Sequence, residues 1–525
     1  MKPISQQQLI FLVSIAFGVF YNYPLFYNIL KVYPFEGLNI IYILSLSIVL
    51  IAFIHLFFTL LSSKYTTKAL LIITLLVSSF TTYFMNTYNV VIDDSMIRNA
   101  LQTNVAESLD LVSFKMILYL LFLGVIPAFF VYKTPLEYRS FKYEIIAKIK
   151  GIGIALGVIA IIIFSFSKFY TSFFREHKVL RFYSNPTYWI YSIGWYIQDT
   201  YKNKDHTLKQ IGLDAKIDPH QKRRIVFMVV GEAARADHFS LNGYTKPTNP
   251  KLSTQDLFNF EKAYSCGTST AHSVPCMFSI YTKKEYSYQK ALYTENVLDV
   301  LKHTNQVAIL WRDNNSNSKG VALRVAYEDF KTPSNNPVCD EECRDIGMLH
   351  NLDHFIQQHK DKDILIILHQ MGNHGPAYYK RYPKEKTIFQ PVCKTNQLEQ
   401  CSKESISNAY DNALAYTDTF LNATIEFAKK YKNADTAVVY MSDHGESLGE
   451  NGIYLHGLPY FIAPDAQIHI GAFIWLNQNF KNAVDISKLK AKRHQKISQD
   501  YLFHTLLGLF DVKTKVYDPK LDLLK

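Results

Sequence analysis

The chain has 525 residues, which is too long for one hydrophobic core and predicts at least two domains. Its net charge of +11 argues for an anionic partner, and because no arginine-rich or aromatic RNA-binding motif is present, we expect anionic lipid and no nucleic acid. The 48% hydrophobic composition is an average over two unlike parts: apolar runs of membrane length occur only before about residue 170, and the remainder is typical of a soluble α/β protein.

Five apolar stretches in the first part reach the length that spans hydrocarbon. They are residues 9–30, 39–61, 69–84, 112–132 and 151–170. The first is too long for a signal peptide and has no small-x-small cleavage site, so we expect it to remain as an anchor. The sequence therefore predicts a transmembrane domain of five helices over residues 1–170.

The charges between the stretches predict the orientation. The basic loops contain Lys64, Lys68, Lys133, Arg139, Lys142, Lys148 and Lys150. The loop at residues 86–111 instead holds four acidic residues and one basic residue, Arg98. By the positive-inside rule the basic loops are cytoplasmic, so five crossings leave the carboxyl-terminal part outside. We therefore expect a multi-pass protein of the bacterial inner membrane with a periplasmic domain.

That outer loop has helical periodicity of its own. Asn99, Thr103 and Glu107 follow one another at four-residue steps and share one face of the predicted helix. Periodicity alone favours a solvated face there.

A connecting region at residues 171–224 follows the fifth stretch. Its first part mixes aromatic and basic residues, which suits a segment in the lipid headgroup region or a packed bridge between domains. The polar linker 200–224 then leads to the third region, residues 225–525.

Buried strands alternate with amphipathic helices in this third region. The predicted strands are residues 225–230, 307–311, 364–368, 437–441 and 472–475, and the predicted helices include 296–303, 408–431 and 499–510. This alternation predicts an α/β domain with a mainly parallel sheet and helices on both faces.

All six cysteines lie in this region, in three close couples, and no Cys-x-x-Cys metal pair occurs. Pairing cannot be deduced from sequence alone, but nearest-neighbour disulfides are the economical proposal. They would require an oxidising compartment such as the periplasm, in agreement with the loop charges.

The loop at residues 266–276 has a cysteine at each end and small or hydroxylated residues between them. A disulfide across it would hold a hydroxyl such as that of Thr270 in one place. The apolar run 277–281 follows, so Thr270 is expected just before a helix, where free backbone N–H groups favour an anion. The alternative is a surface turn with Ser and Thr as caps.

Polar residues follow three of the predicted strands. Glu232 comes after the first, His374 lies in the loop after the third, and Asp443 and His444 follow the fourth, with His456 a little later. In mainly parallel sheets, ligands gather beyond the carboxyl ends of the strands. We therefore expect these side chains to converge with the hydroxylated loop at one edge.

Glu232, Asp443 and His444 are ligands suited to zinc, and a catalytic zinc site keeps one position for the reacting group. Thr270 would fill that position, because a bound dication lowers the pKa of a hydroxyl. The two loop histidines would hold phosphate oxygens or a second metal. Each histidine alone is more often structural; the agreement of several strand-end clusters favours the metal site.

Five motifs identify a family: Gly231-Glu232, the loop 266–279, Trp311-Arg312-Asp313-Asn314-Asn315, Gly372-Asn373-His374-Gly375-Pro376 and Ser442-Asp443-His444-Gly445-Glu446. With these motifs the chain resembles the lipid A phosphoethanolamine transferases, which include the mobile colistin-resistance enzymes and belong to the alkaline-phosphatase/sulfatase superfamily. The resemblance covers nearly the whole chain and implies five membrane helices before an alkaline-phosphatase-like (sulfatase-like) periplasmic α/β catalytic domain.

The resemblance implies a role for each candidate residue. Thr270 would be the nucleophile that is transiently phosphoethanolaminylated, in a site with one tightly bound zinc ion and room for a second. The other residues are Glu232, Asp443 and His444 as zinc ligands, His374 and His456 at the phosphate or a second zinc, Asn315 and Lys319 at the substrate, and Asn99, Thr103 and Glu107 at the ethanolamine end. The last assignment replaces the solvated-face interpretation of the outer loop.

The family also pairs its cysteines as nearest neighbours, here Cys266–Cys276, Cys339–Cys343 and Cys393–Cys401. His272 is a departure, because the family's residue at this position varies and is often apolar. This departure leaves the core site intact and bears only on metal or pH behaviour.

We therefore expect a monomeric transferase that moves phosphoethanolamine from phosphatidylethanolamine to a lipid A phosphate, lowers surface negative charge and favours polymyxin resistance. Core sugars or other surface glycans are alternative acceptors. A membrane-anchored sulfatase or phosphodiesterase is the second enzyme class. A glycerol phosphate polymer synthase would share the spans and the threonine, but the Cys266–Cys276 bracket speaks against it. A non-catalytic lipid-binding scaffold remains the last alternative, which the intact site residues disfavour.

Overall fold

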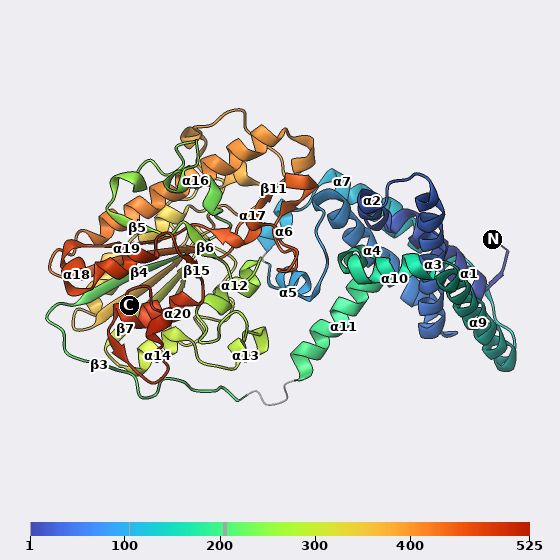
Figure 1. Ribbon diagram of the computed structural model, residues 1–525, viewed down its shortest axis with the longest axis horizontal. Helices are drawn as coiled ribbons and strands as arrows, with labels where there is room; N and C mark the ends of the chain where they lie inside the picture. Colours follow the sequence, from blue (N-terminus) through green and yellow to red (C-terminus); the bar gives the residue numbers. More distant parts are fainter. Residues whose placement is uncertain (1, 104, 203–206) are drawn as a thin grey trace. The chain divides into compact units, whose positions relative to one another are not determined.

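The structure is a computed structural model that describes residues 2–103, 105–202 and 207–525 (Figure 1). These residues divide into two compact units: residues 1–97 with 112–197, and residues 98–111 with 198–525. Part of the outer loop thus belongs to the same unit as the carboxyl-terminal half. The domain ranges expected from the sequence, 1–170, 171–224 and 225–525, stay a prediction.

The first unit contains helices that are long and apolar enough to cross a membrane. Four such helices lie in the described residues: α3 (Leu38–Leu61), α4 (Thr67–Tyr88), the continuous run Phe114–Lys133 formed by α7, a π-helical turn and α8, and α9 (Phe141–Ser165). A fifth crossing is made if the bent pair Gln6–Tyr21 and Tyr23–Val32 counts as one span. This agrees with the five predicted spans.

The bent pair has a local cause for its 54° bend. Helix α1 (Gln6–Ala16) passes into a π-helical turn, and α2 (Tyr23–Val32) restarts with Pro24 in its first turn, where the ring has no N–H to continue the ladder. Asn22 at the break donates a side-chain hydrogen bond to the carbonyl oxygen of Phe17, 2.9 Å away.

The predicted boundaries of the fifth span, 151–170, were wrong. The helix begins at Phe141 and ends at Ser165, and α10 (Ser167–Glu176) is a separate helix. The charged residues near its start are typical of a loop, but Lys148 reaches the carboxyl end of α3 and donates to the carbonyl oxygens of Leu60 and Ser62 at 3.2 and 2.9 Å. A lysine stem covers apolar surface while its head finds polar partners, so charge does not end the helix.

Short helices complete the membrane-proximal part of the chain. They are α5 (Asp94–Gln102), α6 (Val105–Asp110), a 3₁₀ segment at Lys178–Tyr183 and α11 (Thr187–Lys202).

A seven-stranded sheet forms the centre of the second unit (Figure 1). Its order is β5 (Leu257–Asn259), β14 (Ala472–Leu476), β10 (Asp435–Ser442), β4 (Arg224–Gly231), β9 (Asp363–His369), β7 (Val307–Asp313) and β8 (Ala326–Asp329). The five strands from β10 to β8 are parallel, and β14 runs antiparallel to both its neighbours. The prediction of a mainly parallel sheet is confirmed.

Helices cover both faces of this sheet, because its central strands are buried on both sides. Along β4, Val226 and Met228 pack into one hydrophobic core with α14 (Val297–His303) and α20 (Tyr501–Leu509), whereas Phe227 packs into the other with α16 (Lys403–Ala428). The alternation follows the two-residue period of a strand.

Smaller elements surround the sheet. They are α12 (Thr270–Met277), α13 (Tyr288–Leu292), α15 (Leu352–Gln358), α17 (Asp465–Ile468), α18 (Gln478–Ala483), α19 (Ile486–Lys492), the hairpin of β11 (Ser447–Leu448) and β12 (Tyr454–Leu455), a three-stranded sheet of β13 (His469–Ile470), β6 (Lys262–Tyr264) and β15 (Lys496–Ser498), and the pair β3 (Lys216–Ile217) and β16 (Val512–Lys513). Three disulfides join the cysteines as nearest neighbours, 266 to 276, 339 to 343 and 393 to 401, which confirms the predicted pairing.

Candidate active site

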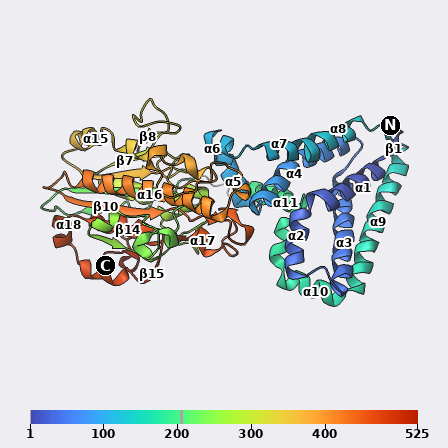
Figure 2. The ribbon, with the colours of Figure 1, turned by 90° about the horizontal axis from the view of Figure 1, so that it is seen from above.

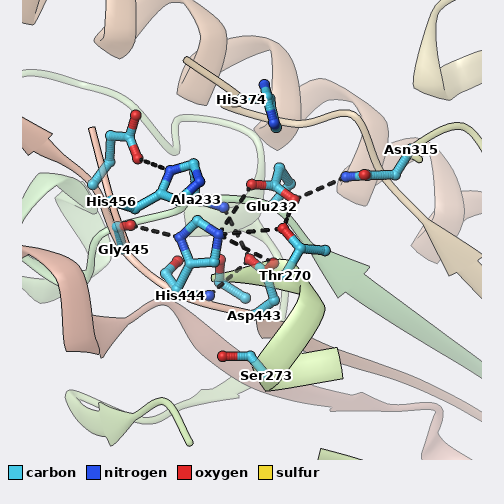
Figure 3. Close-up of polar contacts among 12 residues, drawn as sticks. Glu232, Ala233, Thr270, Ser273, Asn315, His374, Asp443, His444, Gly445 and His456 are labelled. Atoms are coloured by element: carbon cyan, nitrogen blue, oxygen red, sulfur yellow. Dashed lines mark hydrogen bonds and ion pairs between the residues drawn. The ribbon is translucent and has the colours of Figure 1, made fainter. Parts of the chain in front are cut away.

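The carboxyl ends of β4 and β10 build the centre of the site (Figure 3). The two strands are parallel neighbours with Ser442 opposite Gly231, so the residues that follow them face one another. Here His444 Nε2 lies 3.3 Å from Glu232 Oε1 and 3.4 Å from Asp443 Oδ2. These three side chains lie together, as the sequence predicts, and they form a candidate metal-binding group.

The protonation of His444 shows that this group suits a cation. Its Nδ1 lies 2.7 Å from the carbonyl oxygen of Gly445, which can only accept, so Nδ1 carries the proton and Nε2 presents its lone pair to the two carboxylates. Burial lowers the pKa of His444, although Asp443 opposes this shift. Acceptor atoms that converge in a fully buried site repel one another unless a cation lies between them.

Asp443 also presents an oxygen atom that suits a cation. Its Oδ1 accepts backbone N–H groups from Ala233 and His444, whereas Oδ2 has no hydrogen-bond partner among the described residues and is buried. A buried carboxylate oxygen without a donor is costly, and a metal ion would satisfy it. Two carboxylates and an imidazole are ligands that zinc accepts. The residues present therefore fit the expected metal.

Thr270 lies against this group at the first residue of α12. Its Oγ1 donates to Glu232 Oε2 at 3.1 Å and lies 3.4 Å from His444 Nε2, and the residue is 5% exposed. The helix begins here because Ser269 adopts an extended conformation at the N-cap. The N-terminus of a helix carries partial positive charge, so negative charge that develops beside Thr270 Oγ1 is stabilised.

The loop before α12 is anchored from both sides. Thr268 donates from Oγ1 to the carbonyl oxygen of Leu458 at 2.7 Å and accepts the N–H of Gly457 at 2.8 Å. The disulfide closes the loop between Cys266 and Cys276. The Thr270 hydroxyl therefore has little freedom to leave Glu232 and His444.

Gln499, for which the sequence predicts no role in the site, connects this loop to the candidate metal-binding group. Its Oε1 accepts the N–H of Cys266 at 2.7 Å, and its Nε2 donates to the carbonyl oxygens of Ser442 and Asp443, both at 2.8 Å. The residue is fully buried. No motif marks it, and the predicted helix 499–510 placed it inside a helix that in fact begins at Tyr501.

The two predicted loop histidines lie beside His444. The ring centroid of His456 is 4.2 Å from that of His444 and 5.9 Å from that of His374. Burial is the largest cause that lowers the pKa of His374, followed by the nearby Arg381. His374 is therefore a neutral imidazole at pH 7.

Glu446 is a second residue for which the sequence predicts no role, although it is the last residue of the Ser442-Asp443-His444-Gly445-Glu446 motif. Its Oε2 accepts Nδ1–H of His456 at 2.7 Å, and its Oε1 accepts the Tyr378 hydroxyl at 2.7 Å. Glu446, His444 and His456 form another candidate metal-binding group, which shares His444 with the first.

The two predicted substrate residues of the β7 loop differ in position. Asn315 donates from Nδ2 to Glu232 Oε2 at 2.8 Å and to the carbonyl oxygen of Gln370 at 2.7 Å, so it contacts a candidate metal ligand (Figure 3). Lys319 is buried and its Nζ donates to the carbonyl oxygen of Gln102 at 3.3 Å. Lys319 thus connects the β7 loop to the outer-loop segment.

That segment, residues 98–111, packs on the second unit. Gln102 Nε2 donates to the Tyr288 hydroxyl at 2.9 Å, and the Arg98 guanidinium lies 3.9 Å from the centroid of the same ring. Of the predicted ethanolamine-end residues, Asn99 is half-buried, and Thr103 donates its hydroxyl to the Asn99 carbonyl oxygen at 2.7 Å. The side chain of Glu107 lies outside the described residues.

Asp110 anchors the other end of the segment. It accepts Lys380 Nζ at 2.6 Å and Arg381 at 2.8 Å, and Arg381 Nε also donates to the carbonyl oxygen of His374 at 2.6 Å. Burial raises the pKa of Asp110, but Arg381 and Lys380 outweigh it and lower the pKa overall. One guanidinium thus connects the outer loop to the loop that carries His374.

Two family models match this chain and show its class of protein. The sulfatase family model matches residues 224–512, the part that carries the sheet and the site. A second family model, described as phosphoethanolamine transferase EptA/EptB, matches residues 50–201.

Relatives match over the full length. Phosphatidylethanolamine transferase Mcr-1 of Escherichia coli is 41% identical over 97% of this chain and 96% of its own. The solved integral membrane protein lipooligosaccharide phosphoethanolamine transferase A (EptA) from Neisseria meningitidis is 33% identical with a TM-score of 0.96, covering 100% of this chain and 99% of its own. The solved C-terminal periplasmic domain of phosphoethanolamine transferase EptC from Campylobacter jejuni is 42% identical with a TM-score of 0.54, covering 61% of this chain and 98% of its own. The chain belongs to the phosphoethanolamine transferase family and is a multi-pass inner-membrane transferase with a periplasmic sulfatase-like domain.

Proposed function

We propose that the chain transfers phosphoethanolamine from phosphatidylethanolamine to a phosphate group of lipid A, through a covalent intermediate on Thr270. The observation that carries the proposal is the position of Thr270 Oγ1, 3.1 Å from Glu232 Oε2 and 3.4 Å from His444 Nε2 at the start of a helix. The names of its relatives supply the group transferred and the donor.

We infer that Glu232, Asp443 and His444 hold one zinc ion, since their donor atoms converge and fit it. When bound, zinc would lower the pKa of the Thr270 hydroxyl and offset negative charge at the transferring phosphate. A second ion would have to share His444 with the first if it used Glu446 and His456. We therefore expect one tightly bound ion per chain.

The transfer takes place in two displacements at phosphorus. In the first, Thr270 Oγ1 forms a bond to the phosphorus of the donor, the bond to the diacylglycerol oxygen breaks, and diacylglycerol leaves with the proton released by Thr270. In the second, a phosphate oxygen of lipid A forms a bond to the same phosphorus, the bond to Thr270 Oγ1 breaks, and Oγ1 takes up the proton of the attacking phosphate hydroxyl to become the threonine hydroxyl again. Modified lipid A carries less net negative charge, so cationic peptides such as polymyxins would bind the surface less strongly.

The residues around Thr270 have distinct roles in these steps. Glu232 Oε2 orients the hydroxyl by accepting its hydrogen bond, and Asn315 holds the same oxygen in place. Glu446 accepts Nδ1–H of His456, so when this histidine carries a proton on both ring nitrogens, Nε2–H would donate to a phosphate oxygen. His374, neutral and close to His456, contacts the same group.

The test is Thr270→Ala in the full chain, with mass spectrometry of lipid A and of the peptide that contains residue 270. We expect lipid A modification to fall by about a thousandfold or more, as for loss of a nucleophile, while zinc content stays unchanged in the folded protein. Thr282→Ala is the matched control, because it removes a hydroxyl from a half-buried position in the same region.

The metal assignment is tested separately. Asp443→Ala should lower zinc content, measured by elemental analysis of purified protein, whatever happens to transfer.

Normal lipid A modification by folded Thr270→Ala protein would remove Thr270 from the mechanism. Release of free phosphoethanolamine without modified lipid A would instead identify a hydrolase.

A further inference from the structure

Helices α1, α3 and α9 lie side by side in the membrane-spanning unit (Figure 2). Residues of all three line a groove. Its volume of about 800 Å³ lies within the range of small-molecule sites. Its lining residues include Ala52, Gly151 and Ala155, whose small side chains leave the space open. The groove lies within one unit and shares no residue with the candidate active site.

The groove has one apolar end and one polar end. Ile15, Ile48 and Val158 line the apolar end, whereas Gln7, Lys150 and other polar residues line the opposite one. Along α9, the eight helical steps from residue 150 to residue 158 rise about 12 Å, close to the half-thickness of about 15 Å of a bilayer's hydrocarbon core. The groove thus extends through about one leaflet.

The polar end faces the cytoplasmic leaflet. The carboxyl end of α9 leads on toward the periplasmic domain, so the amino end of α9, where Lys150 lies, is cytoplasmic. The carboxyl end of α3 lies at the same end of the bundle, because Lys148 of α9 bonds to Leu60 and Ser62. The amino end of α1 lies there too, because Thr59 of α3 donates to Gln7 Oε1 at 3.3 Å.

Two side chains at the polar end have nitrogen atoms without a hydrogen-bond partner among the described residues. His55 is 9% exposed, and its Nδ1 has no hydrogen-bond partner among the described residues. Lys150 makes no hydrogen bond or ion pair with the described part of the chain, in contrast to Lys148 two residues earlier. His55 lies inside the apolar helix α3, where an ionisable side chain is costly to keep unless it has a function.

We propose that this groove binds an anionic glycerophospholipid of the cytoplasmic leaflet. Its acyl chain lies along the floor formed by Ala52, Gly151 and Ala155, and its phosphate lies between Lys150 and His55. The lysine supplies the charge that selects an anionic head over a zwitterionic one, and the imidazole supplies a hydrogen bond to the phosphate or ester oxygens. The bound lipid differs from the zwitterionic donor of the proposed transfer and occupies the opposite leaflet.

The test uses delipidated full-length protein in detergent, titrated with phosphatidylglycerol, phosphatidylethanolamine or phosphatidylcholine and followed by native mass spectrometry. We expect one phosphatidylglycerol to be retained per chain and the two zwitterionic lipids to be retained less. Lys150→Ala should weaken that retention about fivefold, the loss expected for one lysine beside an anionic lipid. Ala52→Phe should abolish it by filling the floor.

Two controls keep the result interpretable. Lys142→Ala removes an exposed charge from the same helix outside the groove and should leave retention unchanged. Because a buried Ala52→Phe chain could misfold, the same lipids are also followed by their effect on the melting temperature. Phosphatidylglycerol should raise it equally in the wild type and Lys142→Ala, and should raise it less in Lys150→Ala. Equal retention of the three lipids, or full retention by Lys150→Ala, would overturn the proposal.

Discussion

Gln499 shows how a residue without catalytic chemistry holds the site together. Its single amide group bonds to Cys266 on the loop that carries Thr270 and to the carbonyl oxygens of Ser442 and Asp443 beside the candidate metal-binding group. Both sides are therefore fixed relative to each other through one buried side chain. A small displacement between them would lengthen the distance of 3.4 Å between Thr270 Oγ1 and His444 Nε2.

Gln499→Leu should lower both stability and transfer. It leaves one N–H and two carbonyl groups buried without this partner, and each such group costs about 1–3 kcal/mol. We expect a lower melting temperature and transfer lowered by about tenfold, since small misplacements at a reacting centre are costly. Gln478→Leu, on α18, is the control.

The conservative variant Gln499→Glu separates positioning from packing. It keeps the acceptor for Cys266 N–H but places an oxygen against two carbonyl oxygens, so it should not restore transfer. Wild-type rates and melting temperatures in both variants would show that Gln499 does not position the site.

At the scale of residues, the sequence predicts those site residues that are typical metal ligands and that follow directly after a strand. Glu232, Asp443 and His444 converge as expected because neighbouring parallel strands deliver them to one edge. Gln499 and Glu446 could not be found in that way: an amide that bonds to backbone groups, and a carboxylate that orients a histidine, depend on contacts between distant segments.

At the scale of elements, the outer-loop segment 98–111 is held at both ends to the unit that contains the site. Gln102 lies between Tyr288 and Lys319, and Asp110 bonds to Lys380 and Arg381. Arg381 is nearly fully buried and also bonds to the backbone of the His374 loop. Helical periodicity could not reveal this, because a solvated face and a docked polar face have the same residue pattern.

Asp110→Asn should impair use of the donor. The change keeps the shape of the side chain but removes the charge that faces two cations, so the segment and the His374 loop should both be held less firmly. We expect a raised KM for phosphatidylethanolamine with zinc content unchanged. Asp361→Asn, at an exposed position, is the control.

The pH dependence of this contact has a definite sign. The pKa of Asp110 is lowered in the folded protein, so its contribution is present above the unfolded pKa of about 4 and is lost only as pH falls through the folded value. The difference between wild type and Asp110→Asn should therefore be constant from pH 5 to pH 8. A difference that changes steeply in this range would assign the effect to another group.

At the scale of the whole molecule, apolar length predicted the membrane spans and strand alternation predicted the sheet. The start of the fifth helix was missed because charged residues in its first turns resemble a loop. The membership of residues 98–111 in the second unit was also not predictable, since Asp110 and Arg381 are 271 positions apart. Only a folded chain reveals that contact.

A fragment of residues 207–525 should retain zinc but transfer poorly from bilayers. The related periplasmic domain of Campylobacter jejuni was solved on its own, so this part is expected to fold. The fragment lacks both the anchor and the segment 98–111. We expect zinc content equal to that of the full chain, and a much lower rate of Thr270 modification with phosphatidylethanolamine in vesicles. Equal rates in both proteins would show that neither missing part contributes to donor use.

The discontinuous second unit sets the rule for making hybrids between members of the family. A hybrid with a single crossover in the linker would pair Asp110 of one parent with Lys380 and Arg381 of the other. Its second unit would then be built from the sequences of two different parents. Both units stay whole only when residues 98–111 are inherited with 198–525, which requires crossovers before residue 98, after residue 111 and before residue 198. Recombination between relatives is constrained by the same three positions.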